Sequence, residues 1–340
     1  HGHQRIMPAF PSYRFLIPAL SALMLGSGPT FGADNPLVVT SLKPLELLVR
    51  AVAHDQVAVT TLVPAGSSPH TYQLRPSQRQ DLEDAERVFW VGPDMETFLT
   101  RLLSGPDLRD RAVALAPDDS DHAHGEANHH GHDDQGHRDH DNHDHDGHQH
   151  ASEEDHHDHG HSHAEGEDPH VWLDPALALA MAKTIAVSLK EINGVDPQAI
   201  DENLESFAQD LKQREDTIRQ QLTAARGLDL FTYHDAFGRF AEHYGLEITG
   251  VLALSPERSP GARHLAEVQE RLRDADQACL MIEPQFDRQW WQSLMGDVEL
   301  PISVWDPLAT DIPATPDGYL AFQQSMADAV SGCLPEHAQQ

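Results

Sequence analysis

The sequence is poor in basic residues, in long apolar segments and in enzyme motifs. Lysine and arginine number 23 against 55 aspartates and glutamates, and the pI is about 4.9. This acidity argues against nucleic-acid binding, which needs a basic surface. A helix that spans a membrane needs about 20 consecutive apolar residues, and the apolar runs of this sequence are shorter. The chain also has no HExxH motif, glycine-rich phosphate loop or nucleophile elbow, so no motif indicates catalysis.

Cysteine is equally scarce, with only Cys279 and Cys333 in 340 residues. In an oxidising compartment an even pair favours a disulfide bond, although two buried thiols are the alternative.

The first 33 residues have the pattern of an export signal. Met7 is the expected start, Arg14 gives a positive region, and residues 15–25 form an apolar run of signal-peptide length. Small residues follow and end at Ala33, where we expect cleavage. No cysteine lies near that junction, which excludes a lipid anchor of the lipoprotein type. We therefore predict a protein exported to the periplasm, and we expect a monomer.

Residues 118–168 form a histidine-rich tract with seventeen acidic residues and one basic residue, Arg138. The tract has no aliphatic side chain larger than alanine, so it cannot bury enough apolar surface to offset the entropy of ordering. We predict a disordered loop that binds metal ions weakly through its imidazoles; a plain acidic linker is the alternative. Its histidines are His122, His124, His129, His130, His132, His137, His140, His143, His145, His148, His150, His156, His157, His159, His161 and His163.

Outside the tract, short β-branched strands alternate with helices, which is typical of an α/β fold with mostly parallel sheets. Two such lobes are predicted, residues 34–195 and 228–340. Between them, apolar residues recur at helical spacing from 196 to 225 with charged residues between them. A helix of that length would run about 45 Å, which suits a rigid connection between lobes over residues 196–227.

Three histidines and one aspartate lie where the predicted strands end. His70 is in the loop after the second strand, His170 follows the tract, and His234 and Asp306 close strands of the second lobe. In open α/β sheets ligands bind beyond the carboxyl ends of the strands. Three imidazoles with a carboxylate or a water make a tetrahedral zinc site. Glu283, at another strand end, is either a partner that orients a ligand or a helix-start carboxylate.

Four motifs resemble those of the cluster A-I metal-binding proteins of ABC importers. They are residues 66–77 (GSSPHTYQLRPS), 168–175 (DPHVWLDP), 233–240 (YHDAFGRF) and 304–308 (VWDPL). The resemblance implies two α/β lobes joined by one rigid helix, with a metal ion held between them by His70, His170, His234 and either Asp306 or a water. Histidine at position 234 and the histidine-rich tract are similar to the zinc-specific branch, in which the Cys279–Cys333 pair matches a disulfide.

The resemblance thus implies a protein that captures Zn²⁺ and delivers it to an inner-membrane permease without covalent chemistry. Three alternatives stay open at this stage. A manganese- or iron-binding member of the same family would prefer a different metal. A secreted zinc hydrolase would use a water at the open coordination position. A simple metal buffer would bind through the tract alone.

Overall fold

The structure is a computed structural model that describes residues 35–117, 168–253, 260–284, 289, 291 and 300–335. The predicted export signal and the tract histidines lie outside these residues. Within the described part of the chain, no helix is both long and apolar enough to cross a membrane.

The first lobe is built on a four-stranded parallel sheet with strand order β2-β1-β3-β4. Its strands are β1 (Leu37–Thr40), β2 (Ala58–Thr61), β3 (Arg87–Trp90) and β4 (Ala112–Ala114). The helices between them are α1 (Lys43–Ala53), α2 (Pro76–Asp84) and α3 (Thr97–Leu103). A proline in the first turn starts both α1 and α2, where its missing N–H would have had no partner in the helix.

The second lobe repeats this topology with strand order β6-β5-β7-β8, again all parallel. Its strands are β5 (Asp229–His234), β6 (Ile248–Ala253), β7 (Ala278–Ile282) and β8 (Ile302–Val304). Two of its helices are α6 (Gly238–Tyr244) and α7 (Ala262–Asp274). Cys279 in β7 is joined to Cys333 by a disulfide, which confirms the predicted pair.

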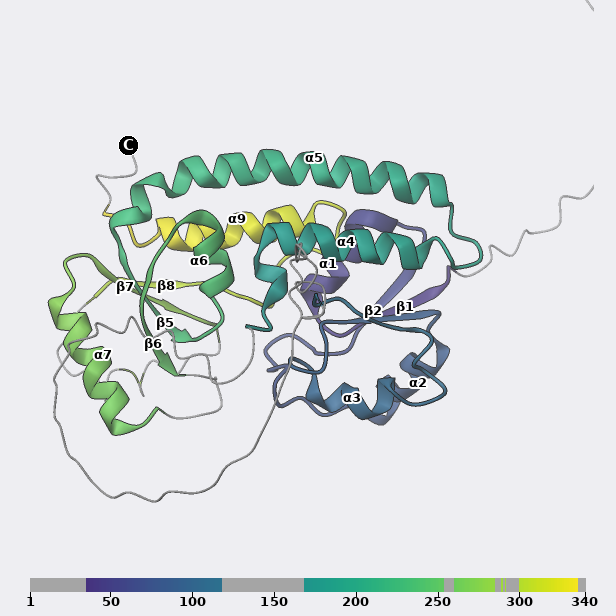
Figure 1. Cartoon of the computed structure of the whole chain (residues 1–340), viewed down its shortest axis with the longest axis horizontal. Coiled ribbons are helices and arrows are strands. Elements are labelled where there is room, and N and C mark those ends of the chain that lie inside the picture. Colours follow the sequence, from purple (N-terminus) through teal and green to yellow (C-terminus); the bar gives the residue numbers. More distant parts are fainter. Residues whose placement is uncertain are drawn as a thin grey trace, which may run out of the picture. The chain divides into compact units, whose positions relative to one another are not determined.

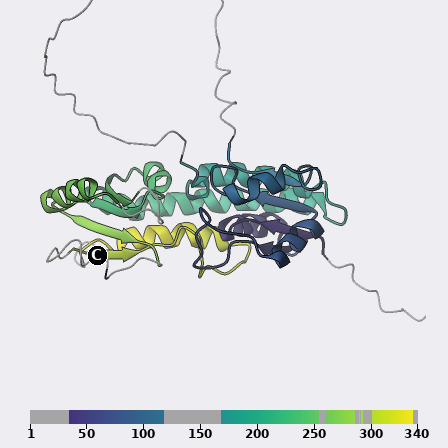
Figure 2. The same ribbon diagram turned by 90° about the horizontal axis from the view of Figure 1, so that it is seen from below.

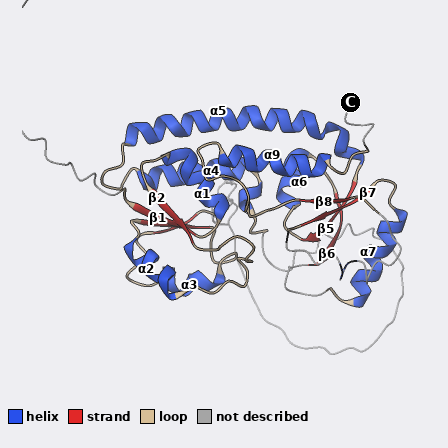
Figure 3. Cartoon of the chain, turned by 180° about the vertical axis from the view of Figure 1, so that it is seen from behind, coloured by secondary structure: helices blue, strands red, loops and turns tan. Residues whose placement is uncertain are grey.

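Further helices pack beside the two sheets (Figures 1 and 2). They are η2 (Val171–Leu173), α4 (Pro175–Leu189), α5 (Pro197–Gln221), η3 (Leu222–Gly227) and α9 (Gly318–Ser331). Helix α5 extends over both sheets and packs against α1, α4 and α9 (Figure 3). Its α-helical part ends four residues earlier than predicted because the chain tightens into the 3₁₀ helix η3, as is common at helix ends.

The α5 helix contacts a different lobe with each half. In its first half, the Asn203 side chain donates to the Val52 carbonyl of α1. In its second half, Arg214 donates to Gln324 of α9, and Glu215 contacts His243 of α6. The predicted role of a connection between two lobes is thus confirmed by contacts at both ends.

Side chains alternate between the two faces of each sheet, as expected for strands buried on both sides. Val38 and Leu230 face one hydrophobic core that both lobes share with α1, α4, α5 and α9. Their neighbours Val39 and Phe231 face separate cores, one in each lobe. Because a continuous core joins the lobes, it opposes large rigid-body motion between them.

Candidate metal centre

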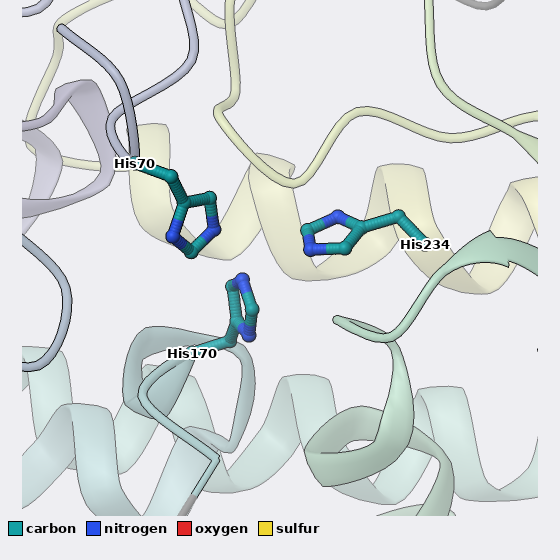
Figure 4. A group of neighbouring side chains, drawn as sticks. All are labelled: His70, His170 and His234. Carbon is teal, nitrogen blue, oxygen red and sulfur yellow. The ribbon is translucent and has the colours of Figure 1, made fainter. Parts of the chain in front are cut away.

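Three histidines from distant parts of the sequence meet at one point. One ring nitrogen from each of His70, His170 and His234 lies within 4.8 Å of the others. The ring centroids are 5.5 Å apart for His70 and His170, 5.6 Å for His70 and His234, and 5.1 Å for His170 and His234. The three rings point toward a common centre (Figure 4). This arrangement brings together all three histidines that the sequence singled out.

Each histidine is placed by the end of a regular element. His70 lies in the loop between β2 and α2, His170 directly precedes η2, and His234 is the last residue of β5. His170 and His234 are each only 4% exposed, whereas His70 is partly exposed. The centre therefore has a buried pair of imidazoles and a third one nearer the solvent.

A carboxylate orients the His234 ring. Glu283, the residue after β7, places Oε1 3.0 Å from His234 Nδ1, and both side chains are 5% exposed. A carboxylate accepts hydrogen bonds, so the proton of the imidazole resides on Nδ1 and the lone pair of Nε2 is available to a metal. Of the two roles considered for Glu283, this contact supports the orienting one.

A second carboxylate orients the His170 ring. Asp168 Oδ1 lies 2.7 Å from His170 Nδ1 and also accepts the His170 backbone N–H at 3.0 Å. Burial acts to raise the pKa of Asp168, but its hydrogen bond to His170, the His170 charge and nearby Arg239 outweigh it, so the pKa lies below its usual value. Asp168 was expected to be the last residue of a solvated loop. It belongs instead to the folded centre, because its carboxylate is hydrogen-bonded to the backbone and the ring of His170.

The loop that carries His70 is anchored by one glutamine of α2. The Gln78 side chain accepts from the Tyr72 hydroxyl at 2.9 Å and from the Arg75 backbone N–H at 3.0 Å, and it donates to the Leu62 carbonyl at 2.5 Å. The Tyr72 ring also meets Phe98 of α3 edge to face. Both ends of the loop are thereby tied to the first lobe.

Asp306 is outside the group of ligand atoms that meet at this centre. Its carboxylate oxygens accept the backbone N–H groups of Leu308 at 2.9 Å and Thr310 at 2.7 Å. The turn that it stabilises includes Ala309, which is buried with φ at 52°, a strained conformation for a residue with a side chain. In this structure Asp306 shapes the loop beside the centre, and the next residue, Pro307, accepts a hydrogen bond from Trp172 Nε1.

The space in front of the rings is small. A cavity of about 20 Å³ is lined by the three histidines and Glu283 together with Ser68, Pro69, Trp172, Pro307 and Leu308. That volume admits about one water-sized occupant. Three neutral imidazoles with one further position match the donor set and geometry of tetrahedral zinc.

The other histidines of the described residues are not part of this centre. His264 Nε2 lies 2.7 Å from the Val251 carbonyl, and His54 ends α1. The His243 ring contacts Asp174 at 3.1 Å and Glu215 at 2.7 Å. The sixteen tract histidines and His337 lie outside the described residues, so their predicted roles stay predictions.

Comparison with known proteins finds relatives over most of the chain. The profile of the family described as zinc-uptake complex component A, periplasmic, matches residues 38–333. A Haemophilus influenzae protein named high-affinity zinc uptake system protein ZnuA is 37% identical over 333 residues, covering 94% of this chain and 98% of that protein. The protein of the same name from Yersinia pestis is 32% identical, with 92% and 95% covered.

Solved structures share the fold. A crystal structure of ZnuA superposes with a TM-score of 0.64 at 21% identity, covering 87% of this chain and 100% of that one. The periplasmic zinc binding protein TroA from Treponema pallidum gives a TM-score of 0.66 at 20% identity, with 88% and 99% covered. At these identities the likeness establishes the two-lobed fold, and the sequence matches establish the family. The chain belongs to the ZnuA family of periplasmic zinc-uptake components.

Proposed function

We propose that this protein captures Zn²⁺ in the periplasm and delivers it to the membrane permease of an ABC importer. The observation that carries the proposal is the convergence of His70, His170 and His234 on one point. Each histidine supplies one nitrogen, and a water completes the tetrahedron, since Asp306 lies outside the group of converging ligand atoms and the cavity admits about one water-sized occupant. The protein performs no covalent chemistry.

Selectivity for zinc follows from the donor set. All three protein ligands are imidazole nitrogens, which suit Zn²⁺, whereas manganese favours oxygen donors and lies lower in the usual stability order. The names of the matched relatives support zinc as the metal. Because imidazole binds a metal only in its neutral form, we expect zinc affinity to fall as the solution is acidified.

Release requires a change in the protein, since a partner shifts a binding equilibrium only by favouring one state. Docking to the permease would distort the three-histidine geometry. His70 is the ligand best placed to move, because it is the least buried and comes from a loop, whereas His234 is held in a strand. The histidine-rich tract is expected to hold further Zn²⁺ ions weakly and to raise the local zinc concentration.

A zinc titration tests this division of roles. A variant that lacks residues 120–165 keeps Asp168 and removes the tract, and it should bind one Zn²⁺ tightly in competition with a chelator. Loss of a residue that only orients a metal ligand typically weakens metal binding by about 10–100-fold. His170→Ala and His234→Ala in that background each remove a ligand and should weaken zinc binding by more than this. His264→Ala is the matched control and should bind normally. No tight site in the deletion variant, or equal affinity for Mn²⁺, would contradict the proposal.

A further inference from the structure

Arg239 lies outside the group of three histidines, but it contacts Asp168, the residue that holds His170. Asp168 holds both the ring and the backbone N–H of His170. Asp168 is in turn held by Arg239, whose Nε donates to the Asp168 carbonyl at 2.7 Å and whose Nη2 donates to the same oxygen. The Arg239 Nε also lies 3.9 Å from Asp168 Oδ2. The Arg239 guanidinium therefore contacts both the backbone carbonyl and the carboxylate of Asp168, the residue that orients His170.

Arg239 belongs to an element that is tied to the other buried ligand. It lies in the first turn of α6, five residues after His234. Four residues further along the same helix, His243 places Nδ1 3.1 Å from Asp174 Oδ1. Residues four apart share one face of a helix. This face of α6 thus holds both ends of the segment 168–174, with His170 between the two contacts.

The two contacts join the segments that carry His170 and His234 into one unit. Their ring centroids are the closest of the three pairs, at 5.1 Å, and both rings are buried. His70 comes from a separate loop with its own anchors in the first lobe. A pair of imidazoles held at a fixed separation by α6 needs only the third ligand to complete the centre.

We propose that Arg239 is a positioning residue for metal capture, which holds Asp168 so that His170 faces the ion bound by His234. Arginine suits this role because two N–H groups of its planar fork donate to the same carbonyl oxygen while its positive charge lies near the Asp168 carboxylate. With both side chains only 16–20% exposed, water replaces these contacts poorly. Loss of the guanidinium would let the 168–170 turn shift and the His170 ring rotate away. This inference rests on the proposed function.

The test is Arg239→Gln in the protein lacking residues 120–165, with Arg263→Gln as the matched control. Arg263 lies on α7, its side chain is 95% exposed, and its ion-pair partner Glu267 is on the same helix. Arg239→Gln should raise the Kd for Zn²⁺ by about 10- to 100-fold, the usual effect of losing an outer partner. It should also alter the visible absorption of bound Co²⁺, which reports the coordination geometry. The melting temperature of the metal-free variant should match that of the control.

The outcomes separate three cases. A Kd within twofold of the Arg263→Gln control, with an unchanged Co²⁺ spectrum, would overturn the positioning role of Arg239. Absence of tight zinc binding in the parent deletion protein would overturn the proposed function itself. If Arg239→Gln fails to fold, Arg239→Lys decides. Lysine lacks the planar fork of arginine. A raised Kd for Zn²⁺ and an altered Co²⁺ spectrum in Arg239→Lys would therefore support the proposal, and values equal to those of the parent protein would refute it.

Discussion

The contact between His243 and two carboxylates makes a sharp prediction about stability and pH. The His243 ring reaches Asp174, which caps the N-terminus of α4, and Glu215 in the second half of α5. These two hydrogen bonds raise the pKa of His243 from 6.5 to about 9 against the opposing effect of burial. The charged imidazole therefore joins α6, α4 and α5 throughout the neutral range.

The size of the effect follows from the shift. A rise from 6.5 to about 9 corresponds to about 3 kcal/mol at 1.36 kcal/mol per pKa unit. The three side chains keep 15–23% of their surface exposed, and solvent screening reduces the figure to about 1–2 kcal/mol. Because the folded-state pKa is the raised one, this stabilisation is complete below pH 6.5 and is lost as the pH rises through about 9.

The assay is urea unfolding of the metal-free protein and of His243→Gln at pH 6 and pH 10. His243→Gln should lower the free energy of unfolding by about 1–2 kcal/mol more at pH 6 than at pH 10. The matched control is His264→Gln, because the His264 ring faces a backbone carbonyl rather than carboxylates. An equal loss of stability in His243→Gln at the two pH values would refute the reasoning.

Three further predictions concern the ligand partner, the packing and the disulfide. Glu283→Gln should weaken zinc binding about tenfold in a chelator competition without changing the stoichiometry. Gly318→Ala should lower the free energy of unfolding in urea by about 1–3 kcal/mol, since its Cβ would lie 2.7 Å from an α1 side chain and from a carbonyl, whereas Gly261→Ala has open space and should not. Reducing the Cys279–Cys333 bond, which closes a separation of 54 residues, should remove about 4 kcal/mol from the same quantity.

Much of the fold was visible in the sequence because its signals are local. The alternation of strands with helices predicted two α/β lobes, and apolar residues at helical spacing predicted the long helix between them. His70, His170 and His234 stood out because each lies where a strand or loop ends. The lobe boundaries and the metal-ligand roles themselves stay predictions that mutation and metal analysis can test.

Apart from Glu283, for which orienting a ligand was one of two predicted roles, the interactions that position these ligands could not be predicted, because they join residues far apart in the chain. Arg239 reaches back 71 residues to Asp168, and composition alone assigned Asp168 to the solvated tract. The contacts of His243 could not be predicted either, because neither of its carboxylate partners, Asp174 and Glu215, is near it in sequence. The choice between Asp306 and a water as the fourth ligand stays a prediction; the structure adds that each Asp306 oxygen accepts one backbone hydrogen bond from the turn that follows it, a contact the sequence did not indicate.

The central claim is that three imidazoles share one ion, and X-ray absorption at the zinc edge tests it most directly. The sample is the protein lacking residues 120–165, loaded with one equivalent of Zn²⁺. The account predicts three imidazole nitrogens and one oxygen at about 2.0–2.1 Å. A spectrum that fits two or fewer imidazoles would contradict it, and so would a His70→Ala spectrum that is identical to that of the parent protein.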